Sequence, residues 1–252
     1  GDPWLGAAPY LAYFSQAQGL LRPDVAVVEV GELFDSWLVR HPEVRAELGS
    51  KRRLSFPLRK LLEQDEPRRL LAEVVEAVVA NLRGQTPLVL AMPSPKHWLH
   101  RANVLAGRSD IELDPDGIED AAMYMADLLR SVSSSPVGGV LLEEHPDDAA
   151  LGDADLERYR PLINVAHHYR WSLALRPQGD GVAGSPVLAE FDAVLSPSVL
   201  ATEPVSVGVD VSQPLWNGGA LPALGKAQFY FAEIPETQRP EFVLESLARL
   251  RA

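Results

Sequence analysis

The stretch AAMYMADLLRSVSSSPVGGVLLEE, Ala121–Glu144, joins an amphipathic helix to a buried strand and decides the fold class. Its first half belongs to a helix that opens at Asp114-Pro115 and carries apolar residues at helical spacing. These residues are Ile118, Ala121, Met125, Leu128, Leu129 and Val132. Val137–Leu142 then forms a continuous apolar run, which is typical of a parallel strand covered on both faces. The stretch therefore predicts one unit of alternating helix and parallel strand.

The same alternation extends over the rest of the chain. Including the run just described, seven strands are predicted: Val25–Val30, Thr86–Met92, Val137–Glu144, Trp171–Pro177, Asp192–Pro197, Val205–Val211 and Gln228–Ile234. Helices are predicted to begin near Asp65, Asp114, Asp153 and Pro240. Leu54–Leu58 is a candidate eighth strand. Eight strands alternating with helices favour a single domain over residues 1–252, a (β/α)8 TIM-type barrel, with an open doubly wound parallel sheet as the alternative α/β fold.

Composition narrows the class of partner. The formal net charge of −12 opposes binding to the phosphate backbone, so no nucleic-acid partner is expected. There is no apolar run of about 18 residues, and the opening GDPWLGAAPY lacks the features of a signal peptide, so we expect a cytoplasmic protein with no membrane partner. The absence of cysteine excludes thiolate catalysis and zinc–thiolate sites. A homodimer is a further possibility that the sequence leaves open.

Two glutamates follow the strand of the opening stretch. In a barrel, functional residues lie at the C-terminal ends of the strands, where Glu143 and Glu144 are placed. The two point to opposite faces if the strand continues, so only one can face the barrel mouth. A carboxylate walled by apolar strand ends has a raised pKa that suits acid–base chemistry. An ordinary charged strand end is the alternative interpretation.

Basic residues follow the strand Thr86–Met92 in PSPKHWLHR, Pro93–Arg101. On a helix, His97 and Arg101 share one face, as do Lys96 and His100. Such a cationic cluster suits a substrate that bears a carboxylate. A solvated basic turn is the alternative.

Charged residues also end other predicted strands. Arg176 could hold a carboxylate bidentately, and Asp210 lies at a comparable position, as do Glu29 and Glu233. Ion pairs within a ring of charges are the alternative for each. GDGVAG, at residues 179–184, matches the GxGxxG pattern, but it is interpreted as a glycine-rich loop at the mouth because little room remains for a crossover helix.

From Thr86 onward, the order of segments resembles the uroporphyrinogen decarboxylase superfamily, a group of barrels that is also related to cobalamin-independent methionine synthase. The resemblance is strongest over residues 86–252, about two thirds of the chain. The segments that carry it are PLVLAMPSPKHWLHRANVLAG, AAMYMADLLRSVSSSPVGGVLLEE, WSLALRPQGD, FDAVLSP, VSVGVDVSQPL and FAEIPETQRPEFVLESLARLRA. It implies a barrel that is either a decarboxylase without a cofactor or a zinc-dependent methyltransferase.

The chain departs from both family chemistries. The Arg-rich substrate motif of the porphyrinogen decarboxylases is not found in residues 1–58, and the stretch WSLALRPQGD offers Arg176 where the methyltransferases have zinc ligands. The resemblance therefore implies a divergent, shortened member of the superfamily.

Together, the residues and the resemblance predict a lyase of decarboxylase type that acts on a small anionic substrate without metal or cofactor. In this hypothesis His97 and Glu144 are catalytic, with one of them protonating the carbon that loses carbon dioxide. The predicted substrate-binding residues are Lys96, Arg101, Arg176 and Asp210. A methyl- or alkyltransferase of the same superfamily and a catalytically silent binding or partner subunit are the alternatives.

Overall fold

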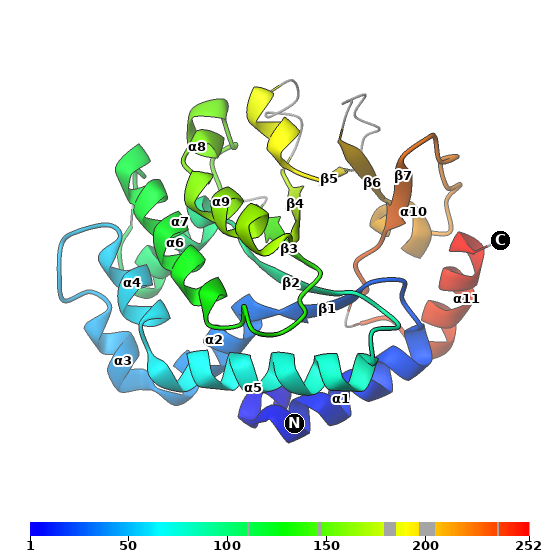
Figure 1. Ribbon diagram of the computed structural model, residues 1–252, viewed down its shortest axis with the longest axis horizontal. Coiled ribbons are helices and arrows are strands. Elements are labelled where there is room, and N and C mark those ends of the chain that lie inside the picture. Colours follow the sequence, from blue (N-terminus) through cyan, green and yellow to red (C-terminus); the bar gives the residue numbers. More distant parts are fainter. Residues whose placement is uncertain (110, 146–147, 179–184, 197–204, 236, 252) are drawn as a thin grey trace.

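Seven parallel strands form one curled, half-barrel sheet in the computed structural model, which describes all of the 252 residues except 110, 146–147, 179–184, 197–204, 236 and 252 (Figure 1). The strands are paired in the order of the chain. They are β1 (Ala26–Glu29), β2 (Leu88–Pro93), β3 (Gly139–Glu143), β4 (Ser172–Arg176), β5 (Ala193–Ser196), β6 (Ser206–Asp210) and β7 (Gln228–Phe231). The α/β fold and the seven strands predicted from apolar runs are confirmed, although the described strands do not close into an eight-stranded barrel.

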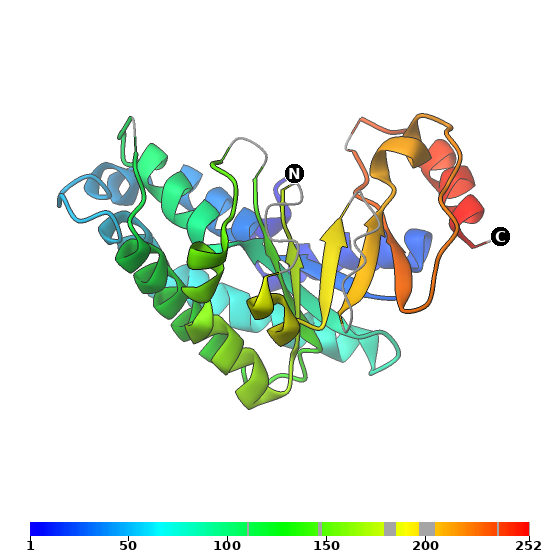
Figure 2. The ribbon, with the colours of Figure 1, turned by 90° about the horizontal axis from the view of Figure 1, so that it is seen from above.

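Helices connect the strands and cover the outer face of the sheet (Figures 1 and 2). They are α1 (Ala7–Leu21), α2 (Val30–Arg40), α3 (Pro42–Glu47), α4 (Phe56–Leu62), α5 (Asp65–Leu82), α6 (Pro95–Leu105), α7 (Pro115–Arg130), α8 (Asp153–Glu157), α9 (Arg160–Tyr169), α10 (Ser212–Trp216) and α11 (Pro240–Leu250). Two short 3-10 turns, Pro3–Leu5 and Pro186–Glu190, complete the described elements. The predicted helix starts near Asp65, Asp114, Asp153 and Pro240 are confirmed, and the third of these helices divides into α8 and α9.

The candidate eighth strand Leu54–Leu58 is wrong, because this stretch leads into helix α4. Pro57 lies in the first turn of that helix, where its missing N–H would have no partner in any case. Leu58, Leu61 and Leu62 are buried at helical spacing. The run of apolar residues was therefore the start of a helical stripe and not a strand.

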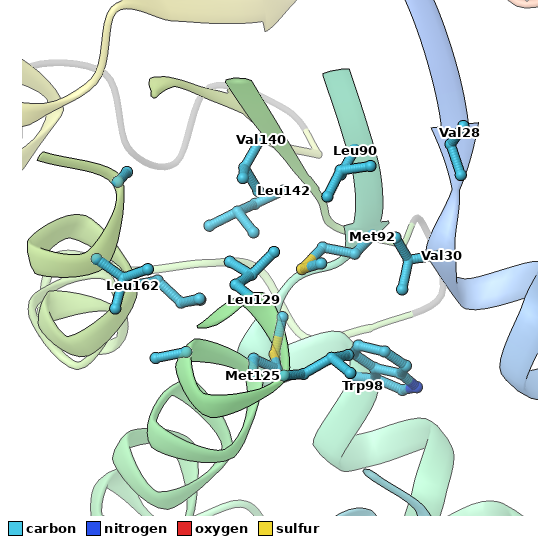
Figure 3. Packing of buried hydrophobic residues seen from close by; sticks show 14 of the residues in the cluster. Val28, Val30, Leu90, Met92, Trp98, Met125, Leu129, Val140, Leu142 and Leu162 are labelled. Atoms are coloured by element: carbon cyan, nitrogen blue, oxygen red, sulfur yellow. The ribbon is translucent and has the colours of Figure 1, made fainter. Parts of the chain in front are cut away.

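The main core lies between the outer face of the sheet and its helices. Figure 3 shows Val28, Leu90, Val140 and Leu142 of the strands packed against Trp98 of α6 and Met125 and Leu129 of α7, together with Met92, Val30 and Leu162. A smaller cluster of Ala91, Leu141 and Leu195, joined by Val89, Ala174 and Phe231, fills the inner face. Because side chains alternate along a strand, Glu143 and Arg176, two positions beyond Leu141 and Ala174, also face inward at the C-terminal edge of the sheet.

The C-terminal end of α1 meets α11 on the side of the molecule where β1 and β7 are not joined. Helix α1 contacts α11, and the Arg251 guanidinium donates to the carbonyl oxygens of Leu21 (2.7 Å) and Arg22 (2.9 Å). Figure 1 shows the end of α1 beside α11. Helices α1 and α11 therefore lie in contact beside the open sheet.

In the part of the chain that the structure describes, no helix combines the length and the apolar character needed to cross a membrane.

Candidate functional site

Arg176, the last residue of β4, gathers three carboxylates at the C-terminal edge of the inner face. Its Nη1 lies 3.1 Å from Glu143 Oε1, and its Nη2 lies 3.0 Å from Asp210 Oδ2 and 2.9 Å from Glu233 Oε2. The guanidinium carbon also lies 4.9 Å from the centre of the Phe231 ring, which is a cation–π contact. These side chains come from the ends of β3, β4, β6 and β7, so the curl of the sheet brings them together.

The arginine is firmly charged. Burial lowers the pKa of Arg176, but its hydrogen bonds to Glu233 and Glu143 and the charges of its partners together raise it by more. The pKa of Arg176 therefore lies above the ordinary value. For Glu143, burial raises the pKa, and the hydrogen bond and charge of Arg176 oppose that rise. The site thus pairs one permanent cation with an excess of carboxylates.

Glu29 adds a protonated carboxyl to this edge. It ends β1 and is paired in register with Ala91 of the inner cluster, so its side chain faces the same side of the sheet. Burial raises the pKa of Glu29 to about 8, and the charges of Glu143, Glu32 and Glu233 add to the rise. At pH 7 this carboxyl carries a proton that it can donate.

The alternation of β3 separates Glu143 from Glu144. Glu143 faces Arg176 on the inner side, whereas Glu144 is buried on the outer side and accepts a 2.5 Å hydrogen bond from the Tyr159 hydroxyl. Burial raises the pKa of Glu144, and hydrogen bonds with Tyr159 and Ser94 oppose the rise. The structure therefore places the Glu144 side chain against Tyr159, on the face of the sheet opposite the Arg176 guanidinium.

Lys96 belongs to the same outer layer as Glu144. Its Nζ donates to Asp155 Oδ2 at 2.6 Å and to the Ala150 carbonyl at 2.9 Å, and it is buried. These bonds tie α6 to α8 and to the segment that precedes it. Lys96 is therefore placed as a structural residue that joins two helices of the outer layer.

His97 lies in a separate cluster on α6. Its Nδ1 lies 2.6 Å from Asp148 Oδ2, His100 Nδ1 lies 2.7 Å from Asp148 Oδ1, and the ring of His145 stacks on His97. Burial lowers the pKa of His97, against the opposing effect of Asp148. At neutral pH this imidazole is therefore mainly uncharged.

Arg101 is paired with Asp35 of α2 by a hydrogen-bonded ion pair. Asp35 lies between the buried residues Phe34 and Trp37 of that helix. Of the six residues predicted to form the site, the structure brings Arg176 and Asp210 into contact, and it places Lys96, His97, Arg101 and Glu144 in contacts with other partners.

Two shallow hollows on the surface lie elsewhere in the fold. One is formed by α7 and α9 around Asn164 and His168, and the other surrounds Ser172 and Asp192 at the start of β4 and β5. Both lie away from the C-terminal edge where the carboxylates gather. Among the described residues, no group of three or more His, Asp or Glu side chains is arranged to hold a metal ion.

Sequence reasoning recognised Glu29, Glu143 and Glu233 as charged strand ends without assigning them a role. The parallel pairing of the strands could have predicted that these residues lie near Arg176, because the C-terminal ends of parallel strands share one edge of the sheet. The partners Tyr159 and Ser212 carried no such signal, since Tyr159 lies in the turn between α8 and α9 and Ser212 begins α10. The glycine-rich loop predicted at residues 179–184 lies outside the described residues.

Comparison with models of protein families, with curated proteins and with solved structures found no match.

Proposed function

We propose that the protein is an acid–base enzyme, a lyase of decarboxylase type, that acts on a small anionic organic molecule at the C-terminal edge of the half-barrel. The observation that carries the proposal is that Glu29 and Arg176 face the same side of the sheet at its C-terminal edge, and burial raises the pKa of Glu29 to about 8. Glu29 replaces His97 and Glu144 as the proposed proton donor, because it lies on the face that Arg176 occupies. The resemblance of residues 86–252 to the decarboxylase superfamily supports the reaction class.

The proposed reaction needs one proton and no electron acceptor. Arg176 anchors an anionic group of the substrate by charge-assisted hydrogen bonds. The bond between the carbon and the departing carboxylate breaks, carbon dioxide leaves, and the electron pair remains on the carbon. Glu29 then transfers its proton to that carbon, and the Glu29 carboxylate regains a proton from water.

The fold supports a variant of the (β/α)8 architecture. We infer that α1 and α11 complete the ring in place of an eighth strand, since Arg251 joins them across the gap between β1 and β7. The strand order follows the chain from β1 to β7, without the reversal that marks a doubly wound sheet. Ligands of barrels bind at the C-terminal ends of the strands, where Arg176 lies.

A catalytically silent binding subunit is the second candidate. The observation that favours it is that all three ion pairs of Arg176 are internal, as in a ring of structural charges. The transferase of the same superfamily ranks below these two, because no described contact gathers a set of metal ligands at this edge.

The test is a panel of small mono- and dicarboxylic acids, incubated in D2O and followed by NMR for loss of carbon dioxide and for deuterium at the product carbon. We expect turnover that falls about 10²–10⁴-fold in Glu29→Gln, the usual contribution of a general acid. Glu76→Gln, at an exposed position of α5, is the matched control and keeps full activity. Turnover that is unchanged in Glu29→Gln contradicts the proposed mechanism, and no turnover across the panel favours the binding subunit. Activity that requires added zinc favours the transferase.

A further inference from the structure

Charge balance limits how an anionic ligand can reach Arg176. The guanidinium already forms ion pairs with Glu143, Asp210 and Glu233, so three carboxylates surround a single cation. A further carboxylate added to this group would meet uncompensated like charge in a partly buried place, where repulsion is stronger than in water. An anionic ligand can therefore bind Arg176 favourably only by taking the place of one of the three.

Asp210 is held too firmly to leave. Its Oδ1 accepts hydrogen bonds from the backbone N–H of Ser212 (2.9 Å) and from the Ser212 hydroxyl (2.5 Å), while its Oδ2 contacts Arg176. The side chain is also largely buried. Release of Asp210 would leave both Ser212 donors without this acceptor.

Glu143 is fixed by the sheet. It is paired in register with both Pro93 of β2 and Arg176 of β4, and its carbonyl accepts a 2.8 Å hydrogen bond from Ser94 N–H. Its side chain is largely buried beside Arg176. This burial leaves the Glu143 carboxylate less room to turn away than an exposed side chain has.

Glu233 has the opposite character. Its side chain is 66% exposed, and among the described residues its carboxylate has one hydrogen-bond partner, Arg176. Its backbone is held, because its N–H donates to the Ser212 hydroxyl at 2.9 Å and its carbonyl accepts from Trp216 Nε1 at 2.6 Å. The side chain can thus swing into water while the chain stays in place, and an ion pair this exposed contributes only about 0–1 kcal/mol.

The place that Glu233 occupies suits a ligand. The charges of Glu233 and Arg176 both act on the pKa of Glu29, so a carboxylate at the Glu233 position lies within electrostatic reach of the protonated carboxyl. The Phe231 ring against Arg176 offers an apolar surface beside the anion.

We propose that the Glu233 carboxylate occupies the position of a ligand carboxylate on Arg176, and that small carboxylic acids bind by exchange with this side chain. The inference rests on the proposed function for the role of Arg176 as the anchor. Glu233 is accordingly a residue that sets specificity, since it competes with ligands from within the chain. Ligands that bind must form hydrogen bonds to Arg176 at least as good as those of the glutamate that they displace.

The test is an NMR titration of the full chain with propionate, which reproduces the end of a glutamate side chain, and with the neutral propionamide. In Glu233→Gln we expect propionate to bind about tenfold more tightly than in the wild type, a change of about 1.4 kcal/mol. Glu233→Asp is the matched control for charge, because it keeps the negative charge but is one methylene too short to reach Arg176 in the same way. We expect it to tighten binding as well, and propionamide to be indifferent to both changes.

The outcomes separate this inference from the proposed function. Equal affinity in all three proteins, or no binding of propionate to any of them, overturns the exchange. Tighter propionate binding in Glu233→Gln but not in Glu233→Asp also overturns the exchange. The loss of a negative charge, and not the removal of a competing side chain, would then explain the higher affinity. None of these results depends on Glu29, so tighter propionate binding without turnover supports the exchange while the lyase reaction fails.

Discussion

At the scale of single residues, the environment of each carboxyl group decides its chemistry. Burial raises the pKa of Glu29 to about 8, the charges of Glu143, Glu32 and Glu233 add to the rise, and the charge of Arg176 opposes it. Glu143 has Arg176 in direct contact, which opposes the rise caused by burial. Burial thus raises the pKa of both carboxyls, and the direct contact with Arg176 is what distinguishes Glu143 from Glu29.

The buried pair of Glu144 and Tyr159 is a structural contact, and Tyr159→Phe tests this directly. Removal of the hydroxyl leaves the Glu144 carboxyl buried without a 2.5 Å hydrogen-bond donor. We expect the free energy of unfolding to fall by about 1–3 kcal/mol, which is the cost of an unsatisfied buried polar group. Urea denaturation at neutral pH measures the change. Tyr13→Phe, at an exposed position of α1, is the control, and an equal effect of both substitutions would contradict the structural role.

The sequence predicted which residues are charged strand ends but not which of them meet. The choice between Glu143 and Glu144 depends on where β3 ends, since a shift by one residue reverses the faces. The contacts of Lys96 with Asp155 and of Arg101 with Asp35 join segments far apart in the chain, and no local pattern encodes them. Arg176 and Asp210 were found because both end strands of one parallel sheet.

At the scale of elements, close approach of β3 and β4 depends on a glycine. A Cβ at Gly139 would lie 2.6 Å from the Ser172 carbonyl oxygen, a backbone atom that cannot turn aside. We expect Gly139→Ala to lower the free energy of unfolding by about 1–3 kcal/mol, in the range of overpacking substitutions. Thermal and urea unfolding measure it.

Gly19→Ala is the matched control for that substitution. Gly19 lies in α1 with open space around it, and alanine is the better helix former there. We expect this variant to be as stable as the wild type or slightly more stable. A Gly139→Ala protein that unfolds like Gly19→Ala would contradict the close packing of β3 on β4.

The strands were predictable because burial on both faces of a parallel strand leaves a continuous apolar run. Leu54–Leu58 shows where this reasoning fails, since a short apolar run does not distinguish a strand from the first turns of a buried helix. The division of α8 from α9 was also missed, because Pro161 in the first turn of α9 allows a new helix to start directly after the previous one.

At the scale of the whole molecule, the core is unevenly distributed. The large cluster packs helices onto the outer faces of β1 to β5, whereas Val207, Val209 and Val211 of β6 and its continuation form a separate small cluster with Tyr230 and Leu250. We expect hydrogen exchange to show slow amides in β2 to β4 and faster, subglobal opening of β6, β7 and α11. Equal protection of both parts would contradict this division.

Closure of the sheet could not be predicted from the sequence. Counting strands favoured eight, and the described residues form seven, with α1 and α11 meeting across the gap. The number of strands that close a barrel depends on the tilt and stagger of the whole sheet, which no single segment encodes.

The proton on Glu29 links the stability of the whole molecule to pH. Between the ordinary pKa of a glutamate and about 8, the folded protein holds a proton that the unfolded chain has released, so stability falls as the pH rises through this range. Relative to the wild type, Glu29→Gln should therefore gain unfolding free energy with rising pH, by up to about 1.4 kcal/mol per pH unit. Urea denaturation across this pH range measures the gain. Glu76→Gln should keep the wild-type dependence, and parallel curves for wild type and Glu29→Gln would contradict the shifted pKa.

The most direct test is an NMR titration of the protein with 13C-labelled glutamate carboxyls, compared between wild type and Glu29→Gln. The structure predicts that the resonance missing from Glu29→Gln titrates near pH 8 in the wild type. If that resonance instead titrates near the ordinary glutamate value, Glu29 is ionised at neutral pH and cannot be the proposed proton donor.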